Sequence, residues 1–95
     1  MKDVFMSIKG TIPVEIIYCV PWSYHGEAVW MTAEFFAEGG SLLAITVTPG
    51  DKGVLKVYVD GEKIYDKSEE DDKHPDLYRV KEMRSFIKNK IANMK

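Results

Sequence analysis

The stretch EIIYCVPWSY, Glu15 to Tyr24, contains the only cysteine of the chain and joins two predicted elements. The residues from Pro13 to Cys19 are mostly β-branched or aromatic, which favours a strand. Both faces of this strand are largely apolar, so we expect a central strand that is covered on both sides. A proline and a tryptophan follow closely, and helical periodicity begins at about Tyr24. Cys19 therefore lies where a buried strand leads into a helix.

The first predicted helix runs from about Tyr24 to Glu38 and ends at Gly39-Gly40, because glycine tolerates the left-handed conformation of a C-cap. Apolar residues at helical spacing predict the side that faces the core. That side comprises Val29, Ala33, Phe36 and Ala37, with Trp30 at its border. Three glutamates predict the side that faces water, and they are Glu27, Glu34 and Glu38, with Met31 between them.

Three further strands follow the helix. The second strand is predicted over Ser41–Val47, and TPGDKG then breaks the chain, with Pro49 as an ordinary turn proline. The third strand runs over Val54–Val59 and turns its alternate apolar residues to one face. Asp60-Gly61 predicts a tight hairpin into the fourth strand, EKIYDK, because Asp-Gly between alternating runs favours a two-residue turn.

The rest of the chain predicts an acidic loop and a second helix. SEEDDKH lacks the alternating carboxylates and the glycine of a calcium loop, so we interpret it as a solvated loop. Pro75 suits the first position of the last helix. Its apolar stripe comprises Val80, Met83, Ile87 and Ile91, assisted by Leu77 and Met94. A solvated basic face is expected from Lys81, Arg84, Lys88, Lys90 and Lys95, which suit the C-terminal end of a helix dipole.

The element order is therefore β-α-β-β-β-α, an α/β (α+β) arrangement. A parallel β-α-β unit crosses over right-handed, and a hairpin then adds two antiparallel strands. A four-stranded mixed sheet of order 2-1-3-4 packed with two helices satisfies these constraints. That arrangement is the minimal thioredoxin-like core. We expect residues 1–95 to form a single domain, with residues 1–10 as a loose N-terminal extension.

The composition excludes several classes of protein. The 95 residues are 45% apolar and 29% charged, which is an ordinary globular balance. No apolar run approaches the roughly 20 residues of a membrane span, and MKDVFMSIKG has no apolar core of a secretory signal. A net charge of -2 gives no electrostatic case for nucleic acid. A single cysteine excludes an intrachain disulfide and fits a reducing compartment, so we expect a cytoplasmic protein without a membrane partner.

In the order and spacing of these pieces the chain resembles the selenoprotein W family, the Rdx group of small thioredoxin-like proteins. The resemblance runs from about Thr11 to Ile91. It rests on the strand VEIIYC, on AVWM at 28–31, on the hairpin VYVDGEKIYDK at 57–67 and on the last helix after its proline. In that family the first strand is followed by C-x-x-C or C-x-x-selenocysteine. The resemblance implies a thiol oxidoreductase or a redox-linked adaptor, with glutathione or a protein thiol as partner.

Cys19 matches the first position of this motif, whereas Trp22 occupies the second. Release of a mixed disulfide within one chain needs a second thiolate, so dithiol chemistry is excluded. We therefore predict at most monothiol exchange through Cys19 with glutathione or a protein thiol. The alternative is a non-catalytic thioredoxin-like module, whose groove beside Cys19, Trp22 and Tyr24 binds a protein. Whether the chain is an enzyme and what its oligomeric state is stay open.

The predicted site comprises Cys19 as the reacting group and Pro21, Trp22, Tyr24 and His25 as binding residues. Cys19 is interpreted either as an accessible thiol before a helix N-terminus or as a small buried side chain, and we expect it to be reachable. Trp22 either plugs the site or forms an aromatic platform with Tyr24, and His25 either faces water or approaches Cys19. Cys19, His25 and His74 lack paired spacing, so we predict no metal, and no cofactor beyond glutathione as a thiol partner.

Overall fold

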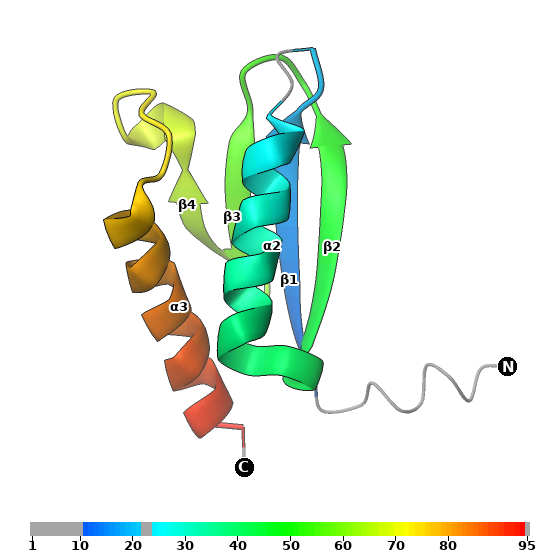
Figure 1. Cartoon of the computed structure of the whole chain (residues 1–95), viewed down its shortest axis with the longest axis vertical. Coiled ribbons are helices and arrows are strands. Elements are labelled where there is room, and N and C mark those ends of the chain that lie inside the picture. Colours follow the sequence, from blue (N-terminus) through cyan, green and yellow to red (C-terminus); the bar gives the residue numbers. More distant parts are fainter. Residues whose placement is uncertain (1–10, 22–23, 95) are drawn as a thin grey trace, which may run out of the picture.

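The computed structural model describes residues 11–21 and 24–94. The helices and strands are β1 (Ile12–Cys19), α2 (His25–Gly39), η1 (Gly40–Leu42), β2 (Leu43–Gly50), β3 (Leu55–Val59), β4 (Glu62–Asp66), η2 (Lys67–Glu69) and α3 (Leu77–Ala92), where η marks a short 3₁₀ helix (Figure 1). This confirms the predicted order β-α-β-β-β-α. The extension predicted for residues 1–10 lies outside the described residues. Within the described ranges, no helix is both long and apolar enough to cross a membrane.

The sheet has the order β2-β1-β3-β4, as predicted. β1 pairs in parallel with β2, in a register that sets Ile12 opposite Leu43 and Cys19 opposite Gly50. β1 pairs antiparallel with β3 on its other side, and β3 pairs antiparallel with β4. The β3–β4 hairpin turns at Asp60 and Gly61, whose φ angles are 54° and 81°. Two positive φ angles are what a tight two-residue hairpin requires, which explains the Asp-Gly pair.

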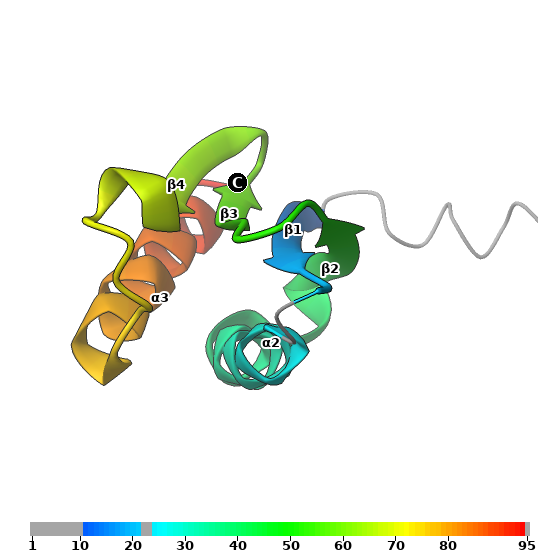
Figure 2. The same cartoon turned by 90° about the horizontal axis from the view of Figure 1, so that it is seen from above.

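Both helices lie on the same face of the sheet (Figure 2). The core fills the space between them and the sheet, and its largest members come from β1, α2, β3, β4 and α3: Ile16, Met31, Phe35, Leu55, Tyr65, Met83 and Ile87. On the opposite face of β1, Pro13 is exposed and Glu15 and Ile17 are half-buried. The prediction that β1 is covered on both sides is therefore wrong for the described residues, because one layer holds both helices.

The predicted apolar side of α2 does not face the core. Ala28, Met31 and Phe35 are buried instead, whereas Val29 is 64% exposed and Phe36 is 45% exposed, and Ala33 and Ala37 are exposed too. The glutamates were wrongly assigned to water for a related reason. Arg84 of α3 donates to Glu34 at 2.7 Å and to Glu38 at 3.2 Å, so these acids lie where the two helices meet. The orientation of α2 about its axis therefore differs from the one that the apolar stripe predicts.

α3 begins later than predicted. Leu77 is its first residue, and the carboxylate of Asp76 caps it by accepting the Arg79 backbone N–H at 2.8 Å. Pro75 is buried just before that cap. Val80, Met83 and Ile87 are buried as predicted, and Ile91 is half-buried. Leu77 and Met94, predicted to assist this stripe, are 53% and 37% exposed, because Leu77 is the first residue of α3 and Met94 lies beyond its last residue, Ala92.

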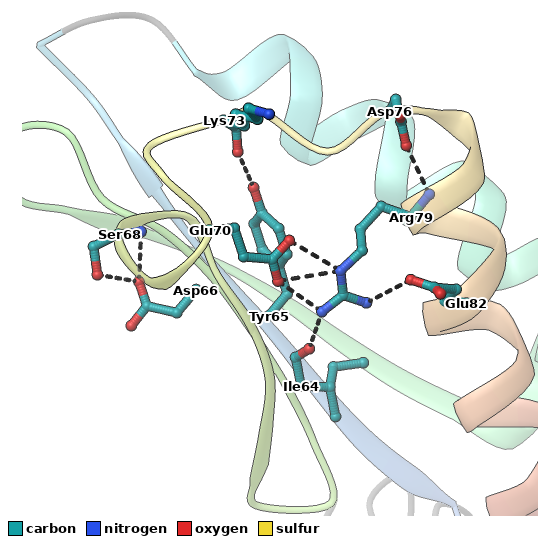
Figure 3. A network of polar contacts seen from close by, with 9 residues as sticks. All are labelled: Ile64, Tyr65, Asp66, Ser68, Glu70, Lys73, Asp76, Arg79 and Glu82. Atoms are coloured by element: carbon teal, nitrogen blue, oxygen red, sulfur yellow. Dashed lines mark hydrogen bonds and ion pairs between the residues drawn. The ribbon is translucent and has the colours of Figure 1, made fainter.

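The acidic segment after β4 is largely exposed, as predicted, and it is also held by polar contacts. Glu70 accepts hydrogen bonds from the Arg79 guanidinium, the shortest at 2.8 Å, and Arg79 also donates to the Ile64 carbonyl at 2.8 Å (Figure 3). The Tyr65 hydroxyl donates to the Lys73 carbonyl at 2.7 Å. Burial raises the pKa of that hydroxyl, and Glu70 adds to the shift. The segment is thus fastened to both β4 and α3.

β2 extends further than predicted, to Gly50, and it starts at Leu43 after the 3₁₀ turn. Pro49 was predicted to be a turn residue, but it is the seventh residue of this strand. A proline has no N–H to donate, and it is tolerated here because β2 lies at the edge of the sheet. The break in the chain is accordingly confined to residues 51–54.

Candidate functional site

Cys19 is the last residue of β1 and is 0% exposed. Its Sγ accepts the backbone N–H of Gly53 at 3.0 Å. Gly53 belongs to the turn between β2 and β3, which is closed by a hydrogen bond from the Val54 N–H to the Asp51 carbonyl at 3.2 Å. The Gly53 φ of 79° suits glycine. The expectation of a reachable thiol is therefore wrong, because this turn lies against the sulfur.

The chain reverses direction directly after Cys19. The backbone N–H of Tyr24 donates to the Cys19 carbonyl at 3.0 Å, and the Tyr24 carbonyl accepts the N–H groups of Glu27 and Ala28 at 3.1 and 3.2 Å. Tyr24 is thus the N-cap residue of α2. Trp22, predicted as plug or platform, lies outside the described residues.

Two other predicted site residues, Pro21 and His25, are exposed. His25 is the first residue of α2, so its exposure agrees with the interpretation of a polar residue that faces water. The structure gives it no role at the sulfur. Pro21 lies in the turn beside Val20, which is 50% exposed. Small apolar groups therefore reach the surface next to the buried thiol.

Tyr24 is the predicted site residue with the richest surroundings. It is half-buried, and its ring meets the His74 ring edge-on, with centroids 4.7 Å apart. The Lys67 Nζ lies 5.6 Å from the centroid of the same ring. Lys67 is only 5% exposed and pairs with Asp72 at 3.6 Å. A cation over an aromatic ring is attractive, so Lys67 holds Tyr24 against the segment that precedes α3.

His74 connects that segment to the first turn of α2. Its Nδ1 lies 2.6 Å from one Glu27 carboxylate oxygen and 2.7 Å from the other. The start of α2 is therefore tied to the segment before α3 by a ring contact and by a hydrogen bond between His74 and Glu27. Because the Tyr24 N–H also donates to the Cys19 carbonyl, the start of α2 and the segment before α3 are both linked to the end of β1. Figure 1 shows the start of α2 at this end of the sheet.

Sequence reasoning missed three residues of this region, namely Gly53, Lys67 and His74. Gly53 is 34 positions from Cys19 and His74 is 47 positions from Glu27, so no local spacing brings them together. Near Cys19 the sequence shows only that no lysine or arginine lies between Gly10 and Lys52. The cation that lies over the Tyr24 ring is Lys67, the first residue of η2.

Chemically, this region offers one thiol, a backbone N–H aimed at it and an aromatic ring with a cation. Among the described residues, no group of three or more metal-ligating side chains comes together. A hollow of about 330 Å³ lies nearby, but it is lined by the acidic segment and the start of α3, including Glu70, His74, Tyr78 and Arg79. Thiol exchange and protein contact are the two activities that such a set of groups can support.

Comparison with known proteins places these features in context. Residues 13–91 match the model of the Rdx family. A crystal structure of a protein from Bordetella parapertussis has 26% sequence identity and a TM-score of 0.68, covering 79% of this chain and 94% of that one. The crystal structure of a selenoprotein W-related protein from Vibrio cholerae has 15% identity and a TM-score of 0.67, covering 88% and 96%, and supports the fold alone. No curated protein matches the sequence.

Proposed function

The chain belongs to the Rdx family, and on that premise we propose that it is a redox-linked monothiol protein in which Cys19 exchanges with glutathione or a protein thiol. The observation that carries the proposal is the position of the sulfur. Cys19 ends β1 immediately before the turn into α2, and its Sγ accepts the Gly53 N–H at 3.0 Å. This is the first position of the motif that the family resemblance identifies. The proposal places the protein in the cytoplasm, where thiols stay reduced.

The exchange needs no second cysteine if an outside thiol completes it. The Cys19 thiol releases its proton to solvent, and the thiolate attacks one sulfur of glutathione disulfide. A new S–S bond forms to Cys19, the old S–S bond breaks, and one glutathione leaves as a thiolate. A second glutathione thiolate then attacks the mixed disulfide, which restores the Cys19 thiolate and forms glutathione disulfide again.

Burial makes local opening part of this mechanism. A disulfide cannot reach a sulfur that is 0% exposed, so the turn over Cys19 must first move away. The segment to be moved is short and irregular, and regions of this kind open at a fraction of the cost of global unfolding. Breaking the Gly53 hydrogen bond to sulfur costs on the order of 1 kcal/mol. Thiol exchange at Cys19 is therefore slow, but it does not require global unfolding of the protein.

The test measures the rate at which the folded protein takes up glutathione from glutathione disulfide. Intact mass spectrometry monitors the formation of the adduct. We expect a single adduct, absent in Cys19→Ser, whose rate changes little at low urea because the opening exposes little surface. Gly53→Ala should raise the rate several-fold, because alanine is strained at a φ of 79° and loosens the turn. A rate that tracks global unfolding across urea concentrations would mean that the thiol is only part of the core.

A second candidate function is a non-catalytic interaction module, and the complete burial of Cys19 is the observation that favours it. In this case the surface around Val20, Pro21 and Tyr24 binds a protein partner without covalent chemistry. Capture of partners by wild type and by Cys19→Ser separates the two functions. A mixed disulfide disappears on reduction and in the variant, whereas binding by the surface survives both.

A further inference from the structure

The two edges of the sheet are protected very differently. β4, at one edge, has five residues that include Glu62, Lys63 and Asp66, and its pairing with β3 is interrupted by a register shift. Its Ile64 carbonyl is also occupied by Arg79. β2, at the other edge, has eight residues in an unbroken register with β1. From Gly39 to Gly50 the sequence contains no charged residue. Charges, bulges, short length and proline are the usual protections of an edge strand, and of these β2 has only Pro49, near its end.

The side chains of β2 become more exposed toward its end. Leu43 is 5% exposed and Ile45 packs against the core, which identifies the row that faces the helices. Val47 belongs to the same row, since alternate residues of a strand share a face, yet it is 39% exposed. The apolar row of β2 thus continues out of the core and onto the surface.

An exposed side of α2 lies next to this strand. Glu34 binds Arg84 of α3, so it marks the side of α2 that faces α3. Phe36 stands two positions later and points about 160° away from Glu34 on an α-helix, which is away from α3. Val29 likewise stands two positions after Glu27 and points about 160° away from it. Figure 2 shows α3 on one side of α2 and the sheet above α2, with β2 at the edge of the sheet that lies away from α3.

Exposed apolar residues of α2 and β2 therefore lie on the side of the molecule away from α3, and we call them the β2 flank. They are Val29 (64% exposed), Phe36 (45%) and Val47 (39%). The flank combines the edge strand of the described sheet with a helix surface whose exposed residues are uncharged. A partner that fits it has to supply both a strand and an apolar helix side.

We propose that the partner is a second copy of this chain, joined about a two-fold axis at the β2 edge. The axis sets the two β2 strands antiparallel, so that the outward N–H and C=O groups before Pro49 pair and the two sheets become continuous. It also brings the α2 helices of the two copies side by side, so that each flank packs against its own equivalent. Such self-complementary contacts are typical of two-fold dimers.

The size of this surface suits a reversible dimer. Eight strand residues span about 26 Å at roughly 3.3 Å per residue. The shortest extent of the molecule is 20 Å, which is the direction in which the helix layer and the sheet stack (Figure 1). Each copy therefore contributes on the order of 500 Å², and the pair buries about 1,000 Å², which is the lower end of specific interfaces. We expect a dimer that forms with rising concentration.

The experiment is sedimentation velocity of the full chain over a wide range of concentrations, with Val47→Lys and Phe36→Glu as flank variants. The wild-type mass should rise from 10.9 kDa to twice that value. Each variant should weaken association about ten-fold or more, because it puts a charge into the edge or into the helix contact. Leu77→Glu is the matched control, since Leu77 is 53% exposed on α3, and it should associate like wild type.

Circular dichroism checks that each variant is folded. If a flank variant does not fold, the wild type alone decides through hydrogen exchange, because the β2 amides should exchange more slowly as the concentration rises. A wild-type chain that stays at monomer mass, or β2 exchange that does not depend on concentration, overturns the proposal and assigns the flank to another occupant. Equal weakening by Leu77→Glu and Phe36→Glu also overturns it.

Discussion

At the scale of single residues, Asp66 is the acid whose surroundings are most specific. Its side chain is 6% exposed and accepts hydrogen bonds from the Ser68 hydroxyl at 2.7 Å, the Ser68 N–H at 3.0 Å and the Lys63 ammonium at 2.9 Å. Burial alone would raise the pKa of Asp66. The bonds from Ser68 and Lys63 outweigh burial and hold the pKa below its usual value of 3.8.

We predict that Asp66→Asn lowers the free energy of unfolding at neutral pH by about 1–3 kcal/mol, since hydrogen bonds to a buried charged group are lost. Because folding lowers the pKa of Asp66, its contribution is complete above pH 3.8 and disappears as the pH falls through the lower folded-state value. Urea unfolding at several pH values measures the difference between variant and wild type, which should shrink in acid.

Glu69→Gln is the control for this prediction. Glu69 binds the same Lys63 ammonium at 2.9 Å, but its side chain is 63% exposed. Exposed ion pairs contribute little, so the change should stay within about 0.5 kcal/mol. A cost for Asp66→Asn that is equally small, or one that is constant down to low pH, would contradict the role assigned to this carboxylate.

Much of the residue-scale pattern could be predicted from local sequence. The Asp60-Gly61 hairpin follows from two residues and their neighbours, and the position of Cys19 at a strand end follows from the run before it. The burial of Cys19 could not be predicted, because Gly53 is brought to the sulfur by pairing between β1 and β2. The positions of Lys67 and His74 around Tyr24 could not be predicted either, because both residues lie far from Tyr24 in the sequence.

At the scale of elements, the contact between α2 and α3 explains why the apolar stripe of α2 misled the prediction. Arg84 donates to Glu34 and Glu38 across the helix pair, and these bonds raise the pKa of the Arg84 guanidinium. Positions that look solvated in one helix are thus in contact with the other helix. Local sequence could not reveal this contact, because Arg84 and Glu34 are 50 positions apart.

We predict that Arg84→Glu destabilises the fold by about 1–2 kcal/mol, because half-exposed attractions become repulsions. Adding Glu34→Arg should restore part of the loss. The cost should also fall at high salt, since salt screens surface charges. Thermal unfolding at low and high salt provides the measurement. Lys88→Glu changes the same charge at an exposed position one turn along α3, and an equal cost there would refute the specific pairing.

At the scale of the whole molecule, the sheet has a helix-covered face and an open face. The strand order could be predicted, because a right-handed crossover and a tight hairpin leave few alternatives. The side on which the second helix packs could not, since Ile17 and Ile16 look equally apolar in the sequence. Ile16 is 0% exposed, whereas Ile17 is half-buried on the opposite face of β1.

These two neighbours provide a direct test of the one-sided core. Ile16→Ala should cost about 2–5 kcal/mol, because it leaves a cavity among packed side chains. Ile17→Ala should cost clearly less, below about 1.5 kcal/mol, because water already reaches that face. Denaturant titration of both variants gives the comparison, and similar costs would indicate that the second face of the sheet is also covered.

The direction of the elements has a practical consequence. β1 begins, and α3 ends, at the end of the molecule opposite to the turn that covers Cys19 (Figure 1). A fluorescent protein or a surface tether fused after α3 would therefore be anchored at the far pole and would leave the cysteine pole facing outward. Immobilised in this way, the molecule would present the same pole to every soluble partner, which makes it well suited to single-molecule or biosensor formats.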